Sequence, residues 1–187
     1  MIRLTRRAVL SAASVLAIAS VLPLAAQVSR DCNETTLPGA AREVLKAKFP
    51  SWRPKQVSDL DEDDRELWLK AHDKECPGIA TGHFERADKS AYAVLLVPKA
   101  NPTSGYELIV LNAPQGRGYI ARVLDQAKGQ TYSGLVISAL APGKYSNFED
   151  TQSVVLKLDG IHLEWIEKGA HLFYWSGGRY HKLQISD

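Results

Sequence analysis

The chain lacks the short motifs that mark the common hydrolases, metalloenzymes and thiol oxidoreductases. It contains no HExxH, no CxxC, no GxSxG and no SxxK. Each of these patterns places metal ligands or an activated nucleophile on one local element, so their absence excludes the enzyme classes that a sequence reveals most directly. We therefore predict no catalytic residues and no cofactor.

The chain also lacks a strong excess of charge of one sign. It carries 23 Lys and Arg against 21 Asp and Glu, and three of the arginines lie in the first 26 residues, so removing these residues leaves 20 basic against 21 acidic side chains. No basic block alternates with aromatic residues, which argues against a nucleic-acid partner. No segment after residue 26 has the ~20 consecutive apolar residues needed to cross a bilayer.

The N-terminus has the pattern of an export signal. Arg3, Arg6 and Arg7 precede an uncharged run from Ala8 to Ala26 that is rich in Ala, Val and Leu. This pattern predicts a cleaved signal peptide over residues 1–26. The paired arginines fit a bacterial twin-arginine signal and also occur in ordinary Sec signals. We therefore predict a periplasmic or secreted protein with a mature chain of residues 27–187, long enough for one domain.

Only two cysteines are present, Cys32 and Cys76. In an oxidising compartment, two cysteines outside any redox motif most simply form one disulfide bond. We predict a Cys32–Cys76 bridge that ties the mature N-terminus to the region around residue 76.

Two helices are expected in the first half of the mature chain. Residues 37–49 place Ala41, Val44, Leu45 and Phe49 on one face, with Thr36 as a candidate cap. A second helix is expected over residues 62–71, since the acidic side chains at its start favour the helix dipole.

From residue 79 onward, short runs of Val, Ile, Leu and Tyr alternate with Gly, Pro and Asn. The expected strands are 79–84, 91–97, 106–111, 118–124, 133–139, 152–158, 161–167, 171–175 and 179–185, and the segment 141–151 is expected to be a long loop. Asp159-Gly160 and Gly177-Gly178 have the composition of two-residue hairpin turns. Because no helices separate the strands, we predict an α+β domain: a mainly antiparallel sheet or sandwich with one or two N-terminal helices packed against it.

One stretch resembles a known repeat. In residues 76–96, Gly82, Phe84, Lys89 and Tyr92 stand as in the FG-GAP or VCBS unit of integrin-type propellers. In that family, alternating aspartates in the loop hold calcium, and the resemblance implies a strand–turn–strand of the same shape here. His83, Ala87 and Ala91 replace aspartates of that pattern, and Arg86 and Asp88 replace glycines.

The altered loop is short of calcium ligands. His83, Glu85 and Asp88 are its remaining candidates, whereas calcium takes about six to eight oxygen atoms. We predict no metal site in this loop, and a calcium-stabilised module is kept as an alternative function. One such unit is also too little chain to form a propeller.

Aromatic residues are concentrated in the last strands. Trp165, Trp175 and Tyr180 would form a partner-binding patch if they share a solvent-facing side, and would otherwise fill the core. The sequence favours an exported, non-enzymatic domain that binds a protein or cell-envelope component, in the manner of an inhibitor or an interaction module. The alternative is an envelope hydrolase whose active site is assembled from distant residues. Neither the partner nor the oligomeric state is specified.

Overall fold

The computed structural model describes residues 32, 36–72, 75–113, 118–129 and 131–187. The predicted signal peptide lies outside this part of the chain. Within the described residues, no helix combines the length and the apolar character that a membrane span requires.

Both expected helices form. The helix α1 spans Gly39–Lys48 and buries Ala41 and Leu45, with Pro38 rather than Thr36 at its N-cap position. The helix α2 spans Glu62–His72 and buries Trp68. Three acidic side chains occupy its first turn, where they complement the helix dipole.

A short 3₁₀ turn and eleven strands make up the remaining regular structure of the described residues. The turn η2 spans Val57–Asp59. The strands are β1 (Trp52–Pro54), β2 (Ile79–Gly82), β3 (Ala91–Pro98), β4 (Gly105–Asn112), β5 (Ile120–Lys128), β6 (Leu135–Leu140), β7 (Gly143–Ser146), β8 (Ser153–Leu156), β9 (Gly160–Trp165), β10 (Gly169–Ser176) and β11 (Arg179–Ser186).

The strands form two main antiparallel sheets and a separate small one. In the first sheet the order is β1-β3-β4-β5, and β2 also pairs with β3. The second sheet has the order β11-β10-β9-β6, and β7 pairs with β8. The α+β architecture with antiparallel sheets predicted from the sequence is therefore confirmed.

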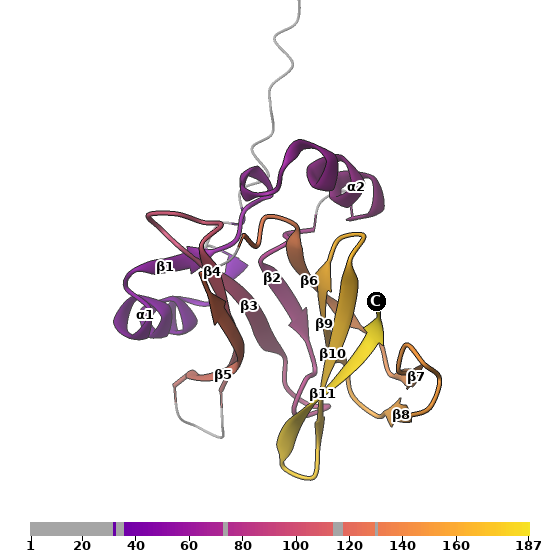
Figure 1. Ribbon diagram of the computed structural model, residues 1–187. Coiled ribbons are helices and arrows are strands. Elements are labelled where there is room, and N and C mark those ends of the chain that lie inside the picture. Colours follow the sequence, from indigo (N-terminus) through magenta and orange to yellow (C-terminus); the bar gives the residue numbers. More distant parts are fainter. Residues whose placement is uncertain (1–31, 33–35, 73–74, 114–117, 130) are drawn as a thin grey trace, which may run out of the picture.

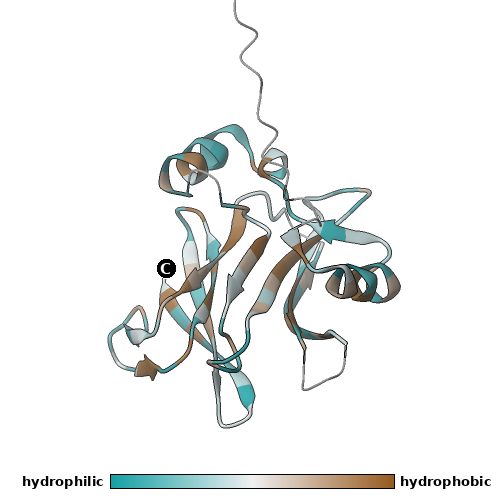
Figure 2. Ribbon diagram, turned by 180° about the vertical axis from the view of Figure 1, so that it is seen from behind, coloured by the Kyte–Doolittle hydropathy of each residue, from teal (hydrophilic) through white to brown (hydrophobic). Residues whose placement is uncertain are grey.

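The largest core cluster lies between the two main sheets. Its buried members include Leu95 and Leu108 of the first sheet and Ile137, Leu163 and Phe173 of the second. Figure 1 shows the two sheets side by side, with the helices on the outside. Figure 2 shows that the strands around this core are the most hydrophobic part of the ribbon.

Three smaller clusters cover the outer faces. The helix α1 packs on the first sheet, where Leu45 and Ile109 belong to one buried cluster. The helix α2 packs on one end of the second sheet, where Trp68 and Val136 share a cluster. The β7–β8 hairpin covers the other end, and its Leu156 is clustered with leucines of β10 and β11.

Two details of the expected strand pattern are wrong. The segment 141–151, expected to be a loop, contains β7, which pairs with β8. The hairpin expected at Asp159-Gly160 does not form, because β9 pairs with β6 and β10 instead. Gly160 serves close packing: a Cβ there would lie 2.5 Å from Leu172 Cδ1.

The hairpin expected at Gly177-Gly178 is confirmed, with φ of 58° and 81° at the two glycines.

Candidate functional site

The edge strands of the two main sheets lie next to each other in two places, which we call margins. The two margins differ in whether side chains join the sheets. At the margin between β5 and β11, side chains join the sheets: Lys182 Nζ donates to Asp125 Oδ2 at 2.7 Å, and the Arg122 guanidinium lies 5.2 Å from the Trp175 ring centre. At the margin between β2 and β6, the sheets leave a groove with a volume of about 330 Å³. We take this groove as the candidate site.

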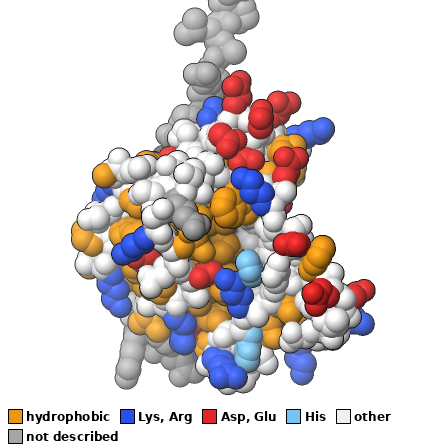
Figure 3. Space-filling view, viewed as in Figure 1, with side chains coloured by type: hydrophobic (Ala, Val, Ile, Leu, Met, Phe, Trp, Pro, Cys, Tyr) orange, Lys and Arg blue, Asp and Glu red, His pale blue; other side chains and the backbone are white. Residues whose placement is uncertain are grey.

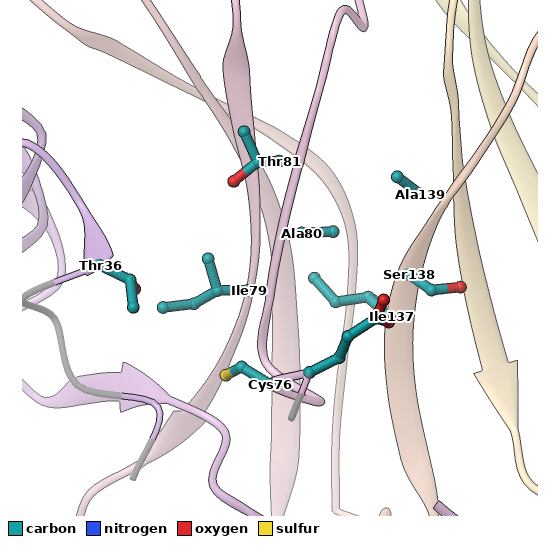
Figure 4. Close-up of a pocket in the computed structure, with 9 residues that line it drawn as sticks. Thr36, Cys76, Ile79, Ala80, Thr81, Ile137, Ser138 and Ala139 are labelled. Carbon is teal, nitrogen blue, oxygen red and sulfur yellow. The ribbon is translucent and has the colours of Figure 1, made fainter. Parts of the chain in front are cut away.

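Both strand margins line the groove (Figure 4). Its walls are Ile79, Ala80 and Thr81 of β2 and Ile137, Ser138 and Ala139 of β6. Thr36, Glu75 and Cys76 complete the lining. Thr81 and Ala139 are exposed to solvent, so the groove is open to a partner.

One end of the groove is closed by covalent and backbone links. The disulfide bond Cys32–Cys76, as predicted, lies beside it. The Ile137 N–H donates to Pro77 O at 2.9 Å, which is the one backbone hydrogen bond between these two segments among the described residues. The closed end is therefore fixed by the fold.

The other end of the groove is bridged by a side chain. Asp159, which directly precedes β9, accepts a hydrogen bond from the backbone N–H of His83 at 2.7 Å. The His83 imidazole lies 3.4 Å from the same carboxylate oxygen. The groove is therefore bounded at each end by a hydrogen bond that links the two sheets.

A buried lysine holds the closed end together. The Lys55 side chain is fully buried, and its Nζ donates to Tyr132 O at 2.8 Å and to Ser133 O at 2.5 Å, just before β6. Its backbone N–H donates to Leu95 O, while the Leu95 N–H donates to Gly78 O. Lys55 therefore joins β1, β3 and the segment that leads into β6.

Burial sets the protonation of Lys55. Removal from water lowers its pKa to about 8, although Asp59 and Asp64 attract the ammonium and oppose this shift. Asp59 itself is held by Arg53 at 2.6 Å, and this hydrogen bond contributes to keeping the pKa of Asp59 below its usual value. Figure 3 shows that acidic side chains gather on the surface over α2, whose first turn carries Glu62, Asp63 and Asp64.

The pattern of the ladders directs backbone groups into the groove. Neighbouring residues of an antiparallel strand point their N–H and C=O groups to opposite sides. Gly78 bonds toward β3, so the backbone groups of Ile79 and Thr81 point away from β3. The Ile79 N–H donates to Cys76 O at 3.4 Å, and Thr81 faces the groove. Ile137 bonds toward β2, so Ala139, two residues further on, points the same way.

A serine and a histidine lie beside the groove. Ser138 Oγ and His162 Nδ1 are 3.4 Å apart, and Glu164 Oε2 lies 3.8 Å from the same nitrogen. Burial lowers the pKa of His162; Glu164 opposes the shift and His72 adds to it. A serine hydrolase relay uses one ring nitrogen for the nucleophile and the other for the carboxylate. Because both contacts here involve Nδ1, these three residues do not form that relay.

The loop residues considered as metal ligands are separated by their own contacts. His83 is held by Asp159, and Asp88 pairs with Arg86 at 2.7 Å. The Glu85 carboxylate accepts a hydrogen bond from Asn112. In the described part of the chain, no three His, Cys, Asp or Glu side chains are grouped to hold a metal ion.

The three aromatic candidates are half-buried, and two of them lie at the edge of the core between the sheets. Trp165 and Tyr180 pack against that core and are half-buried. The Trp165 ring contacts Tyr132, and the Trp175 and Tyr180 rings meet edge to face with centres 5.0 Å apart. Burial and the nearby Glu85 raise the pKa of Tyr180. None of the three lines the groove.

Comparison with known proteins returned no family model, no curated protein and no solved structure that matches this chain. The site is therefore interpreted from its geometry alone.

Proposed function

We propose that this chain is an exported, non-catalytic domain that binds a protein partner of the cell envelope through the groove between β2 and β6. The observation that carries the proposal is the groove itself: two strand margins face one another without pairing, and their backbone groups point into it. Backbone N–H and C=O groups that are left unpaired at a strand edge are available to hydrogen-bond a partner.

The character of the groove supports binding rather than catalysis. Its volume of about 330 Å³ is at the lower end of what small-molecule sites enclose. The nearest nucleophile, Ser138, meets a histidine that is not oriented by a carboxylate on its second nitrogen. An envelope hydrolase remains the alternative, and labelling of Ser138 by a fluorophosphonate would favour it.

Export supports the choice of partner. The N-terminal charge and hydropathy pattern of residues 1–26 is typical of a signal peptide, and a disulfide bond is compatible with an oxidising compartment. We place the mature protein in the periplasm or outside the cell, where envelope proteins are its accessible partners.

The test compares capture of envelope proteins by three forms of the mature chain. Ala139→Trp fills the groove from an exposed position, and Ala100→Trp places the same large side chain in the exposed loop after β3. We expect a protein that the wild type and Ala100→Trp capture equally, and that Ala139→Trp captures at least tenfold less. Equal capture by both variants, with both folded, would contradict a role for the groove.

A further inference from the structure

We propose that the partner fills the groove with a single lysine or arginine side chain. This inference rests on the proposed function, because it identifies which part of a protein partner occupies the same groove. It is carried by the shape of the groove, by the groups that line it and by an equivalent arrangement inside the molecule.

The shape excludes an added strand. A strand placed between two others needs about 9–10 Å between them, which is twice the usual spacing. Here β2 and β6 are tied at one end by the hydrogen bond from Ile137 to Pro77, and at the other by Asp159 bound to His83. The sheets cannot separate along the whole groove while both links hold, so a long side chain fits and a full strand does not.

The lining favours a cation. The backbone carbonyls of Thr81 and Ala139 are directed into the groove by the strand ladders, and carbonyl oxygens accept hydrogen bonds from ammonium and guanidinium groups. Glu75 is the one charged residue among those that line the groove. Its carboxylate is largely exposed and lies 3.1 Å from His72 Nδ1. An entering basic side chain would therefore meet acceptors in the walls and a carboxylate at the rim.

The protein already contains this arrangement near the groove. The Lys55 ammonium is bound by two backbone carbonyls, Tyr132 O and Ser133 O, in the segment before β6. Aspartates attract it without a direct ion pair. The proposed guest would repeat this recognition from outside, with Glu75 in place of the aspartates.

The experiment is an NMR titration of the mature chain at fixed pH with blocked single amino acids. The probes are the N-acetyl amides of arginine, lysine and citrulline; citrulline has nearly the shape of arginine without its charge. We expect saturable shifts of the Thr81 and Ala139 amide signals with arginine and lysine, and at least threefold weaker binding of citrulline. Glu75→Gln should weaken arginine binding at least threefold. Glu149→Gln, an exposed change at the tip of the β7–β8 hairpin, should not change it.

The outcomes separate this inference from the proposed function. Absent shifts, equal binding of citrulline, or no effect of Glu75→Gln would overturn the recognition of a basic side chain. If Ala139→Trp still abolished capture of an envelope protein, the groove would remain the docking site with another kind of occupant. If Ala139→Trp captured proteins like the wild type, the proposed function would fail, whatever the probes did.

Discussion

At the scale of single residues, Lys55 does more for the fold than its sequence context suggests. It lies between Pro54 and Gln56 at the end of β1, where a lysine is usually a surface residue. Its side chain is instead fully buried and binds two carbonyls of the second sheet's leading segment. A buried amine with hydrogen-bond partners can stay in the core, but at the cost of a lowered pKa.

The pKa of Lys55 gives the protein a specific pH dependence. The folded pKa of about 8 lies below the unfolded value of 10.5, so between these pH values the unfolded chain binds more protons. Stability from this group therefore rises with pH across that window, on the order of 2–3 kcal/mol. We expect the free energy of unfolding of the wild type, minus that of Lys55→Met, to increase between pH 8 and pH 10 in denaturant titrations. A flat or falling difference would show that Lys55 is not buried as described.

Gly78 is required because another backbone passes against it. A Cβ at this position would lie 2.3 Å from Lys55 O and 2.6 Å from Lys55 N, and backbone atoms cannot move aside as a side chain does. We expect Gly78→Ala to lower the free energy of unfolding by about 1–3 kcal/mol. Gly118→Ala, where nothing lies within 4 Å of the added Cβ, is the control and should change stability little. Equal unfolding midpoints for the two variants would count against the contact.

At the scale of elements, local patterns predict most of the helices and strands. The expected bounds of α2 agree with the structure within one residue, and each of the nine expected strands has a counterpart. The strands β1 and β7 escape prediction because they are short and contain Pro or Gly, which are unfavourable in strands. The sequence also gives the wrong partner for β8. The Asp159-Gly160 pair predicts a hairpin turn between β8 and β9, whereas Gly160 is needed for close packing against Leu172.

The candidate site is much less predictable than the elements. The strands that line it are expected from the sequence. The groove itself depends on which strands lie at the edges of the two sheets, and local hydrophobic periodicity does not determine strand order. Lys55 carries no motif. The residues that do stand out in sequence, such as Glu85 and Trp175, lie away from the groove and contact other side chains.

The disulfide bond links residue 32 to the closed end of the groove. It closes a loop with a sequence separation of 44 residues that contains α1, β1 and α2. The chain-entropy model gives roughly 4 kcal/mol for a loop of this length. We expect the paired change Cys32→Ser and Cys76→Ser, or reduction of the wild type, to lower the melting temperature by several degrees. Free thiols in the native purified protein would contradict the bridge.

The loop between β2 and β3 is expected to be indifferent to calcium. Its three candidate ligands are held by Asp159, Asn112 and Arg86 rather than by one another. Calcium at millimolar concentration and an excess of chelator should therefore give the same melting temperature within error. A calcium-dependent increase would favour the calcium-stabilised module over the groove-binding domain.

At the scale of the whole molecule, the two margins between the sheets are held together differently, and we propose that only the β2–β6 margin binds a partner. The ion pair between Lys182 and Asp125 and the contact of Arg122 with the Trp175 ring close the β5–β11 margin. Within the second sheet, the half-buried Trp175 ring also packs against Tyr180. The β2–β6 margin is held only at its ends among the described residues, so its centre stays available to a partner. A core between two sheets with helices on the outer faces keeps that opening fixed in shape.

Photo-crosslinking of the chain in its cell of origin tests this division most directly. The photoreactive residue p-benzoylphenylalanine would replace either Ala139 in the groove or Ala100 in the exposed loop after β3. We expect a discrete crosslinked envelope protein with the group at position 139 and none at position 100. No adduct at position 139, or the same adduct from both positions, would contradict the groove as the binding site.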